Sequence, residues 1–173
     1  QGALRVARAE IDALNVFPVP DGDTGTNLYL TVEAACTALS EPADDLAQAA
    51  HWVGKAAILG ARGNSGVIFS ALLRDLMSEL ATSPENFAQA LSHGARGAYQ
   101  AVAIPLEGTI LTVAARAAQE ASLVTAQGAD LAKVASAAAD AAYTSLLHTP
   151  ELLAVLRDAG VVDAGGRGLV VVL

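Results

Sequence analysis

The sequence predicts an all-α domain, a bundle or barrel of about eight antiparallel amphipathic helices. Hydrophobic residues make up 53% of the 173 residues but aromatic residues only 4%, so alanine carries much of the apolar content. Alanine has the highest helix propensity and allows helices to pack closely. Apolar residues also recur at helical spacing between short breaks of proline, glycine and capping residues. No change of composition marks a boundary, so we expect residues 1–173 to form one domain.

The first four helices are expected at Gly2–Leu14, Gly25–Leu39, Asp44–Leu59 and Val67–Leu80. The first ends at a proline-rich segment, and Ser40-Glu41-Pro42 ends the second. The third carries acids in its first turn, where the helix dipole favours them. The glycines before the fourth would each cost about 1 kcal/mol inside a helix, so we expect that helix to open at Asn64 or Ser65.

The remaining helices are expected at Ser83–Val102, Thr109–Ala121, Asp130–Leu147 and Thr149–Ala159. Ser83-Pro84-Glu85 is typical of a helix start, with a serine cap, proline in the first position and an acid in the first turn. Thr149-Pro150-Glu151 repeats this pattern. The chain closes on a glycine-rich segment, residues 160–168, in which Asp163 is interpreted as a cap for the last helix.

Composition and charge exclude several functions. The net charge of −8 argues against nucleic acid and anionic membranes as partners. Cys36 has no second cysteine to pair with, which fits a reducing, cytoplasmic location. No apolar run reaches the length of a transmembrane helix, and no signal peptide is visible. The chain opens within a helical pattern and stops on Val-Val-Val-Leu, so we expect a fragment of a larger protein.

The most unusual segment is Asn15–Asn27, with the sequence N-V-F-P-V-P-D-G-D-T-G-T-N. Gly22 allows a tight turn that brings the carboxylates of Asp21 and Asp23 to one point. Two such carboxylates repel unless a cation lies between them, and Mg²⁺ takes one or two carboxylates with phosphates and water. The four residues that follow add hydroxyls, a side-chain amide and free backbone N–H groups suited to phosphate: Thr24, Gly25, Thr26 and Asn27.

A surface turn rich in turn-forming residues is the alternative interpretation. An EF-hand is excluded because, counting from Asp21, the sixth residue is Thr26 instead of glycine and the twelfth is Val32 instead of glutamate. The chain also lacks the Walker A pattern of P-loop nucleotide-binding proteins.

Two further segments resemble anion-binding loops. Gly60–Gly66 is a glycine-rich turn that leads into a helix, and Arg62 adds positive charge, although a plain capped loop has the same appearance. Glu107-Gly108-Thr109 is a third contact point, through backbone amides and the Thr109 hydroxyl. In antiparallel packing, loops separated by an even number of helices share one end of the bundle. The segments Asn15–Asn27 and Gly60–Gly66 can therefore meet at one end.

Together these motifs resemble the nucleotide-binding DhaL or DAK2 domain of the dihydroxyacetone kinase family, and most closely the A subunit of its fatty acid kinase branch. The sugar-kinase branch has G-D-x-D-H-G, and Thr24 stands where that histidine would be. The residues that carry the resemblance are N-V-F-P-V-P-D-G-D-T-G-T-N at Asn15 to Asn27, G-A-R-G-N-S-G-V-I at Gly60 to Ile68, E-G-T-I-L-T-V at Glu107 to Val113, and L-R-D-A-G-V-V-D-A-G-G-R-G-L at Leu156 to Leu169.

The resemblance implies a barrel of eight helices that binds ATP or ADP and two Mg²⁺ ions at one end. Asp21 and Asp23 match two of the family's metal-binding acids. Asn15 is the nearest match to the third, although it is an amide and lies one residue away from the family spacing. The residues expected to contact the nucleotide are Thr24, Thr26, Asn27, Gly63, Asn64, Ser65, Gly66, Thr109, Arg157 and Asp163.

The resemblance also implies phosphoryl transfer to the carboxylate of a fatty acid, which a separate fatty-acid-binding protein carries, to give an acyl phosphate. Such a transfer depends on positioning and charge neutralisation, and a carboxylate acceptor requires no general base. Two alternatives stay open: the ATP-binding subunit of a dihydroxyacetone-type kinase, and a non-catalytic module that holds a nucleotide. Homodimerisation also stays open, because a region outside this chain could supply it.

Overall fold

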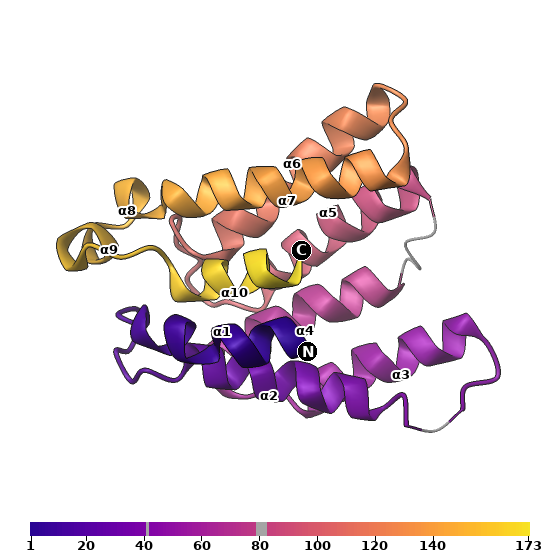
Figure 1. The fold of residues 1–173 in the computed structure, drawn as a ribbon, viewed down its shortest axis with the longest axis horizontal. Coiled ribbons are helices and arrows are strands. Elements are labelled where there is room, and N and C mark those ends of the chain that lie inside the picture. Colours follow the sequence, from indigo (N-terminus) through magenta and orange to yellow (C-terminus); the bar gives the residue numbers. More distant parts are fainter. Residues whose placement is uncertain (41, 79–82) are drawn as a thin grey trace.

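The computed structural model describes residues 1–40, 42–78 and 83–173, and the elements in these ranges are helices, as the sequence predicts. Most run side by side along the long axis of the molecule, while the short α8 and α9 project at one end (Figure 1). The helices are α1 Gly2–Ala13, α2 Thr24–Thr37, α3 Leu46–Leu59, α4 Gly63–Ser78, α5 Pro84–Gln100, α6 Ile110–Ala126, α7 Leu131–Leu147, α8 Thr149–Leu152, α9 Ala154–Ala159 and α10 Ala164–Val172.

Two expectations about the C-terminal part are wrong. The expected helix Thr149–Ala159 is divided into α8 and α9, because Leu153 between them has an extended backbone. The segment 160–168, expected to be a glycine-rich loop, becomes helical at Ala164. The other helices begin or end within a few residues of the predicted positions, and the predicted break at Glu41 and helix end at Leu80 lie outside the described residues.

Close packing explains why α10 forms despite its glycines. A Cβ atom on Gly168 would lie 2.1 Å from Leu28 Cδ1, and one on Gly166 would lie 2.9 Å from Val113 Cγ2. The helix therefore lies against α2 and α6 at a distance that a larger residue would not allow, and burial of these neighbours offsets the low helix propensity of glycine. As a result α10 contacts α1, α2, α6 and α7 and joins the first helices of the chain to the later ones.

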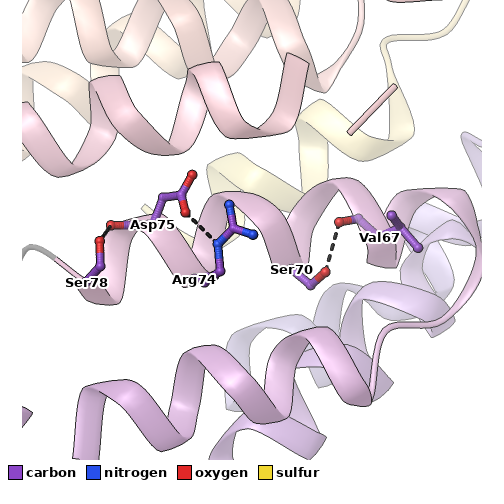
Figure 2. A network of polar contacts seen from close by, with 5 residues as sticks. All are labelled: Val67, Ser70, Arg74, Asp75 and Ser78. Carbon is purple, nitrogen blue, oxygen red and sulfur yellow. Dashed lines mark hydrogen bonds and ion pairs between the residues drawn. The ribbon is translucent and has the colours of Figure 1, made fainter. Parts of the chain in front are cut away.

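A glycine also allows close packing of α4 and α5, here beside an ion pair. Figure 2 shows Arg74 Nε bound to Asp75 Oδ1 at 2.6 Å on α4, with Ser70 and Ser78 each donating to a carbonyl of the same helix. A Cβ atom on Gly97 of α5 would lie 2.1 Å from Asp75 Oδ2. Glycine at this position therefore leaves room for the charged pair between the two helices.

None of the helices in the described part of the chain combines the length and apolar character that would let it cross a bilayer.

The contact between α1 and α2 gives the first prediction. In Gly25→Ala the new Cβ would lie 2.3 Å from the Arg8 carbonyl oxygen and 2.9 Å from Ile11 Cβ, so α1 must shift. We expect the free energy of unfolding, measured by urea denaturation, to fall by about 1–3 kcal/mol. Gly2→Ala is the control, because nothing lies within 4 Å of its Cβ position. Equal stability of the two variants would contradict the packing described here.

Candidate functional site

A cavity of about 620 Å³ lies where four helices begin: α2, α4, α6 and α10. The N-terminus of a helix carries partial positive charge and unsatisfied N–H groups, so a cavity bordered by four of them favours an anion. The sequence-predicted residues that line it are Asn15, Asp21, Asp23, Thr24, Asn27, Gly63, Asn64, Ser65, Thr109 and Asp163. Three others, Thr26, Gly66 and Arg157, do not line it.

Asp21 and Asp23 border the cavity, and their carboxylates accept no hydrogen bond from any described residue. Gly22 between them has φ +67°, the left-handed conformation that glycine adopts without strain and that the tight turn requires. Asp21 is exposed and Asp23 is half-buried. Both carboxylates are therefore available to a ligand.

Asn15 holds this turn in place through side-chain hydrogen bonds. Its Oδ1 accepts hydrogen bonds from the backbone N–H of Asp23 at 3.2 Å and from Thr24, through its N–H at 3.2 Å and its hydroxyl at 2.8 Å. Its Nδ2 donates to the Val19 carbonyl at 2.9 Å. The buried Asn15 thus holds both ends of the turn, and three donors already occupy its carbonyl oxygen.

The expectation that Thr24 and Thr26 present free N–H groups is wrong. The amide of Thr24 donates to Asn15, while Thr26 donates to Asp12, through its N–H to Oδ1 at 2.9 Å and through its hydroxyl to Oδ2 at 2.8 Å. Asp12 is a residue that the sequence analysis missed. One signal for it was present: an acid in the last turn of a helix lies at the end where the helix dipole disfavours negative charge, so it often has a specific partner.

The start of α4 packs directly against α2. Gly63 has φ +57°, and a Cβ atom there would lie 2.3 Å from Asn27 Nδ2. A Cβ atom on Gly66 would lie 2.5 Å from the hydroxyl of Thr31, a fully buried residue that the sequence analysis also missed. This hydroxyl accepts from the Arg62 amide at 3.2 Å and donates to the Asn27 carbonyl at 2.7 Å. Gly66 therefore positions α4, and the cavity side is formed by its neighbours Asn64 and Ser65.

The loop before α6 is fixed by a separate network. Glu107 accepts hydrogen bonds from the hydroxyls of Tyr99 and Thr112, each at 2.6 Å, and these two bonds hold the pKa of its carboxyl below the usual value. The expected contact through the Gly108 amide is wrong, since this N–H donates to Thr112 Oγ1 at 2.9 Å. Thr109 caps α6 by accepting from the Leu111 amide at 3.3 Å.

Asp163 caps α10, as predicted, and it is almost completely buried. Its Oδ2 accepts from the Gly166 amide at 2.6 Å, and its own N–H donates to Thr149 Oγ1 at 3.1 Å. Burial raises the pKa of Asp163 to about 6, although hydrogen bonds from the backbone of Gly166 and Ile110 act in the opposite direction. Arg157, in contrast, is exposed and forms an ion pair with Asp158 at 3.0 Å.

Many of the other lining residues are apolar. They include Phe17, Ile68, Val102 and Leu111, and four further apolar side chains of the lining are partly exposed to solvent: Val19 (54%), Val67 (46%), Ile104 (77%) and Leu106 (41%). The lining therefore combines carboxylates with apolar side chains.

The donor set fits Mg²⁺. Within the described ranges no group of three or more histidine, cysteine or acidic side chains gathers to enclose a metal. Mg²⁺ rarely uses such a cage; it binds through one or two carboxylates and keeps phosphate and water oxygens as its other ligands. Asp21 and Asp23 can supply these carboxylates, since no described residue donates a hydrogen bond to either.

Comparisons with known proteins give one family. The model of the DAK2 domain matches residues 18–173. Protein YloV of Bacillus subtilis is 46% identical over 167 residues, and uncharacterized proteins of Staphylococcus epidermidis and Staphylococcus aureus are 43% identical over 170 and 42% identical over 167 residues. Each alignment covers 94% of this chain and 30% of the relative, so the chain spans less than a third of these curated relatives.

The buried carboxyl of Asp163 gives a prediction about pH. Because its pKa of about 6 in the folded chain exceeds the value of about 3.9 in an unfolded chain, the folded state binds more protons between these values. We expect the metal-free chain to lose up to about 3 kcal/mol of unfolding free energy, relative to Asp163→Asn, as the pH rises from 4 to 6.5. Urea denaturation at several pH values measures the difference, and parallel curves for the two proteins would contradict it.

Proposed function

The chain belongs to the DAK2 domain family, which is associated with nucleotide binding and kinase activity, and from this we propose that its cavity binds Mg²⁺ and ATP for phosphoryl transfer. The acceptor we propose is the carboxylate of a fatty acid, presented by a separate carrier protein and converted to an acyl phosphate. One observation carries the proposal: two uncommitted carboxylates lie at a cavity on which four helix N-termini converge.

The polyphosphate would lie beside these N-termini. Asn27, Asn64 and Ser65 border the cavity with polar side chains, and the helix dipoles of α2 and α4 favour negative charge there. Thr24 also borders it, although its hydroxyl already donates to Asn15. For the predicted contact residues that do not line the cavity, we propose changed roles.

Three predicted residues would act indirectly or after a rearrangement. Thr26 positions α2 through Asp12, and Gly66 allows α4 to pack on α2. A contact between Arg157 and the nucleotide stays a prediction, and it requires the guanidinium to exchange its partner Asp158 for the ligand.

Asp21 and Asp23 would hold the Mg²⁺ ions, two in number by the family resemblance, at the phosphate end of the cavity. Bound Mg²⁺ supplies neutralisation of the charge on the phosphate oxygens during transfer. We assign Asn15 a supporting role and not a ligand role, because its Oδ1 already accepts three hydrogen bonds. Asn15 is the nearest match to the third acid of the family, one residue away from the family spacing.

In the proposed reaction a carboxylate oxygen of the acceptor forms a bond to the γ-phosphorus of ATP. The bond between that phosphorus and the β–γ bridging oxygen breaks, and ADP leaves with the electron pair. The acceptor is already ionised near neutral pH, so no proton has to be removed. The chain's residues therefore bind, orient and neutralise charge.

The apolar residues of the lining support a lipid acceptor. Val19, Ile104 and Leu106 are exposed at the edge of the cavity, where a fatty acid or the apolar rim of a carrier would cover them. The alternatives are the ATP-binding subunit of a dihydroxyacetone-type kinase and a module that binds nucleotide without turnover. A cytoplasmic location belongs to the same proposal, and homodimerisation would depend on parts of the longer relatives that this chain does not cover.

The paired acids give the central prediction. We expect Asp21→Ala/Asp23→Ala to lose the Mg²⁺-dependent part of ATP affinity and at least about 100-fold in turnover, since metal-ion stabilisation contributes several kcal/mol. Isothermal titration with ATP, with and without Mg²⁺, measures the first effect. Asp140→Ala is the matched control, because Asp140 is an exposed acid on α7 outside the cavity. Affinity and turnover like those of the unchanged chain, with the fold intact by circular dichroism, would refute the proposal.

The acceptor is identified by a second experiment. The chain is mixed with γ-labelled ATP, Mg²⁺ and either palmitate on a lipid-carrying protein or dihydroxyacetone. We expect label on palmitate as the acyl phosphate; hydroxylamine then attacks the acyl carbon, releases the label as inorganic phosphate and leaves unlabelled palmitoyl hydroxamate. Label on dihydroxyacetone would support the sugar-kinase alternative, and tight nucleotide binding without any transfer would support the non-catalytic one.

A further inference from the structure

The helices of the described chain differ in whether the side chain of the N-cap residue accepts a hydrogen bond from the first turn. Five of them begin at a polar residue whose side chain accepts an N–H of the same helix, the usual N-cap arrangement. These are α3, α5, α6, α7 and α10, with Asp45 bound to the Gln48 amide, Ser83 to Asn86, Thr109 to Leu111, Asp130 to Lys133 and Asp163 to Gly166. The N-cap residues of α1, α2, α8 and α9 make no such bond, and among these four Asp23 of α2 is the one with a carboxylate that could.

The backbone of Asp23 differs in the same sense. The five bonded caps all have extended backbones, as an N-cap normally does. Asp23 has φ −122° and ψ 1° instead. An aspartate with the common N-cap geometry would accept an N–H of its own helix with its carboxylate. The different conformation of Asp23 leaves its carboxylate without this bond.

Residues of the α1 end supply the missing cap. Asp12 accepts the Thr26 amide at 2.9 Å, three residues after Asp23, which is an N–H that an N-cap side chain commonly takes. It also accepts the Thr26 hydroxyl at 2.8 Å. Asn15 accepts the amide of Thr24, and with it that of Asp23 itself, each at 3.2 Å. The amides of Thr24 and Thr26 in the first turn of α2 therefore have acceptors that are not the side chain of the N-cap residue.

We propose that Asp12 is a positioning residue, which caps α2 in place of Asp23 and thereby leaves the Asp23 carboxylate free to bind a divalent cation. This inference rests on the proposed function of the cavity. Without Asp12 the Thr26 amide has no acceptor, and Asp23, three residues before it, is the side chain suited to replace it. A cation would then compete with the helix for the same carboxylate.

The competition is measured with Mn²⁺ as the probe, added to the nucleotide-free chain and followed by electron paramagnetic resonance of the unbound ion. We expect Asp12→Ala to bind Mn²⁺ about five-fold more weakly, the cost of breaking one N-cap hydrogen bond before the metal binds. Asp12→Asn is expected to bind nearly as well as the unchanged chain, because its Oδ1 can still accept the Thr26 amide. A simple loss of negative charge would instead weaken Asp12→Asn as much as Asp12→Ala, and that result would overturn the inference.

Asp130→Ala is the matched control for loss of a cap. It removes the bond to the Lys133 amide at 2.8 Å, at the start of α7 and outside the cavity. We expect it to lower the melting temperature without changing Mn²⁺ affinity. If it weakens Mn²⁺ binding as much as Asp12→Ala does, the effect is one of general stability and the inference is overturned.

A second measurement needs no metal. We expect Asp23→Ala alone to change the melting temperature little, because its carboxylate makes no bond. We expect Asp12→Ala/Asp23→Ala to lower the melting temperature by more than the two single changes added together, because the replacement cap is then lost. Additive melting temperatures together with normal Mn²⁺ binding would refute only the role of Asp12. A chain that binds no Mn²⁺ before any substitution would refute the proposed function itself.

Discussion

The close contact between α1 and α2 at Gly25 is the constraint on which the rest of the site depends. A side chain there would overlap the Arg8 carbonyl, so the two helices meet only because residue 25 has none. At this separation the Asp12 carboxylate reaches the first turn of α2 and takes two hydrogen bonds from Thr26. Asn15, just beyond the end of α1, takes the neighbouring amides. Packing in the interior thus fixes a turn at the surface.

The carboxylates at this end of the molecule divide into two groups. Asp12, Glu107 and Asp163 each accept at least one hydrogen bond that holds a loop or a helix start in place. Asp21 and Asp23 accept none from the described residues, yet they border the same cavity. Direct coordination of a metal needs carboxylate oxygens that are not already held by donors, so among these acids the uncommitted pair is the one suited to act as ligands.

Local chemistry determined which parts of the fold could be predicted from the sequence. Capping residues such as Ser83 and Asp163 act on amides two or three positions away, so their helix starts were predictable. The placement of segments Asn15–Asn27 and Gly60–Gly66 at one end of the bundle followed from helix alternation alone. The continuation of α10 through its glycines was not predictable, because glycine is favoured there only by Leu28 and other neighbours distant in the sequence. The roles of Asp12 and Thr31 depend equally on contacts between helices, which no spacing rule along the chain reveals.

The assignment of the cavity's titratable groups also bears on the choice of acceptor. Among its described lining residues the titratable side chains are Asp21, Asp23 and Asp163. Asp163 is engaged at the start of α10, and a carboxylate that holds a metal ion cannot also remove a proton. A hydroxyl acceptor, such as that of a sugar, would have to lose its proton to some group during transfer, and no histidine lines this part of the site. A carboxylate acceptor has already lost that proton, so transfer to it requires only positioning and neutralisation of charge, which these residues can supply.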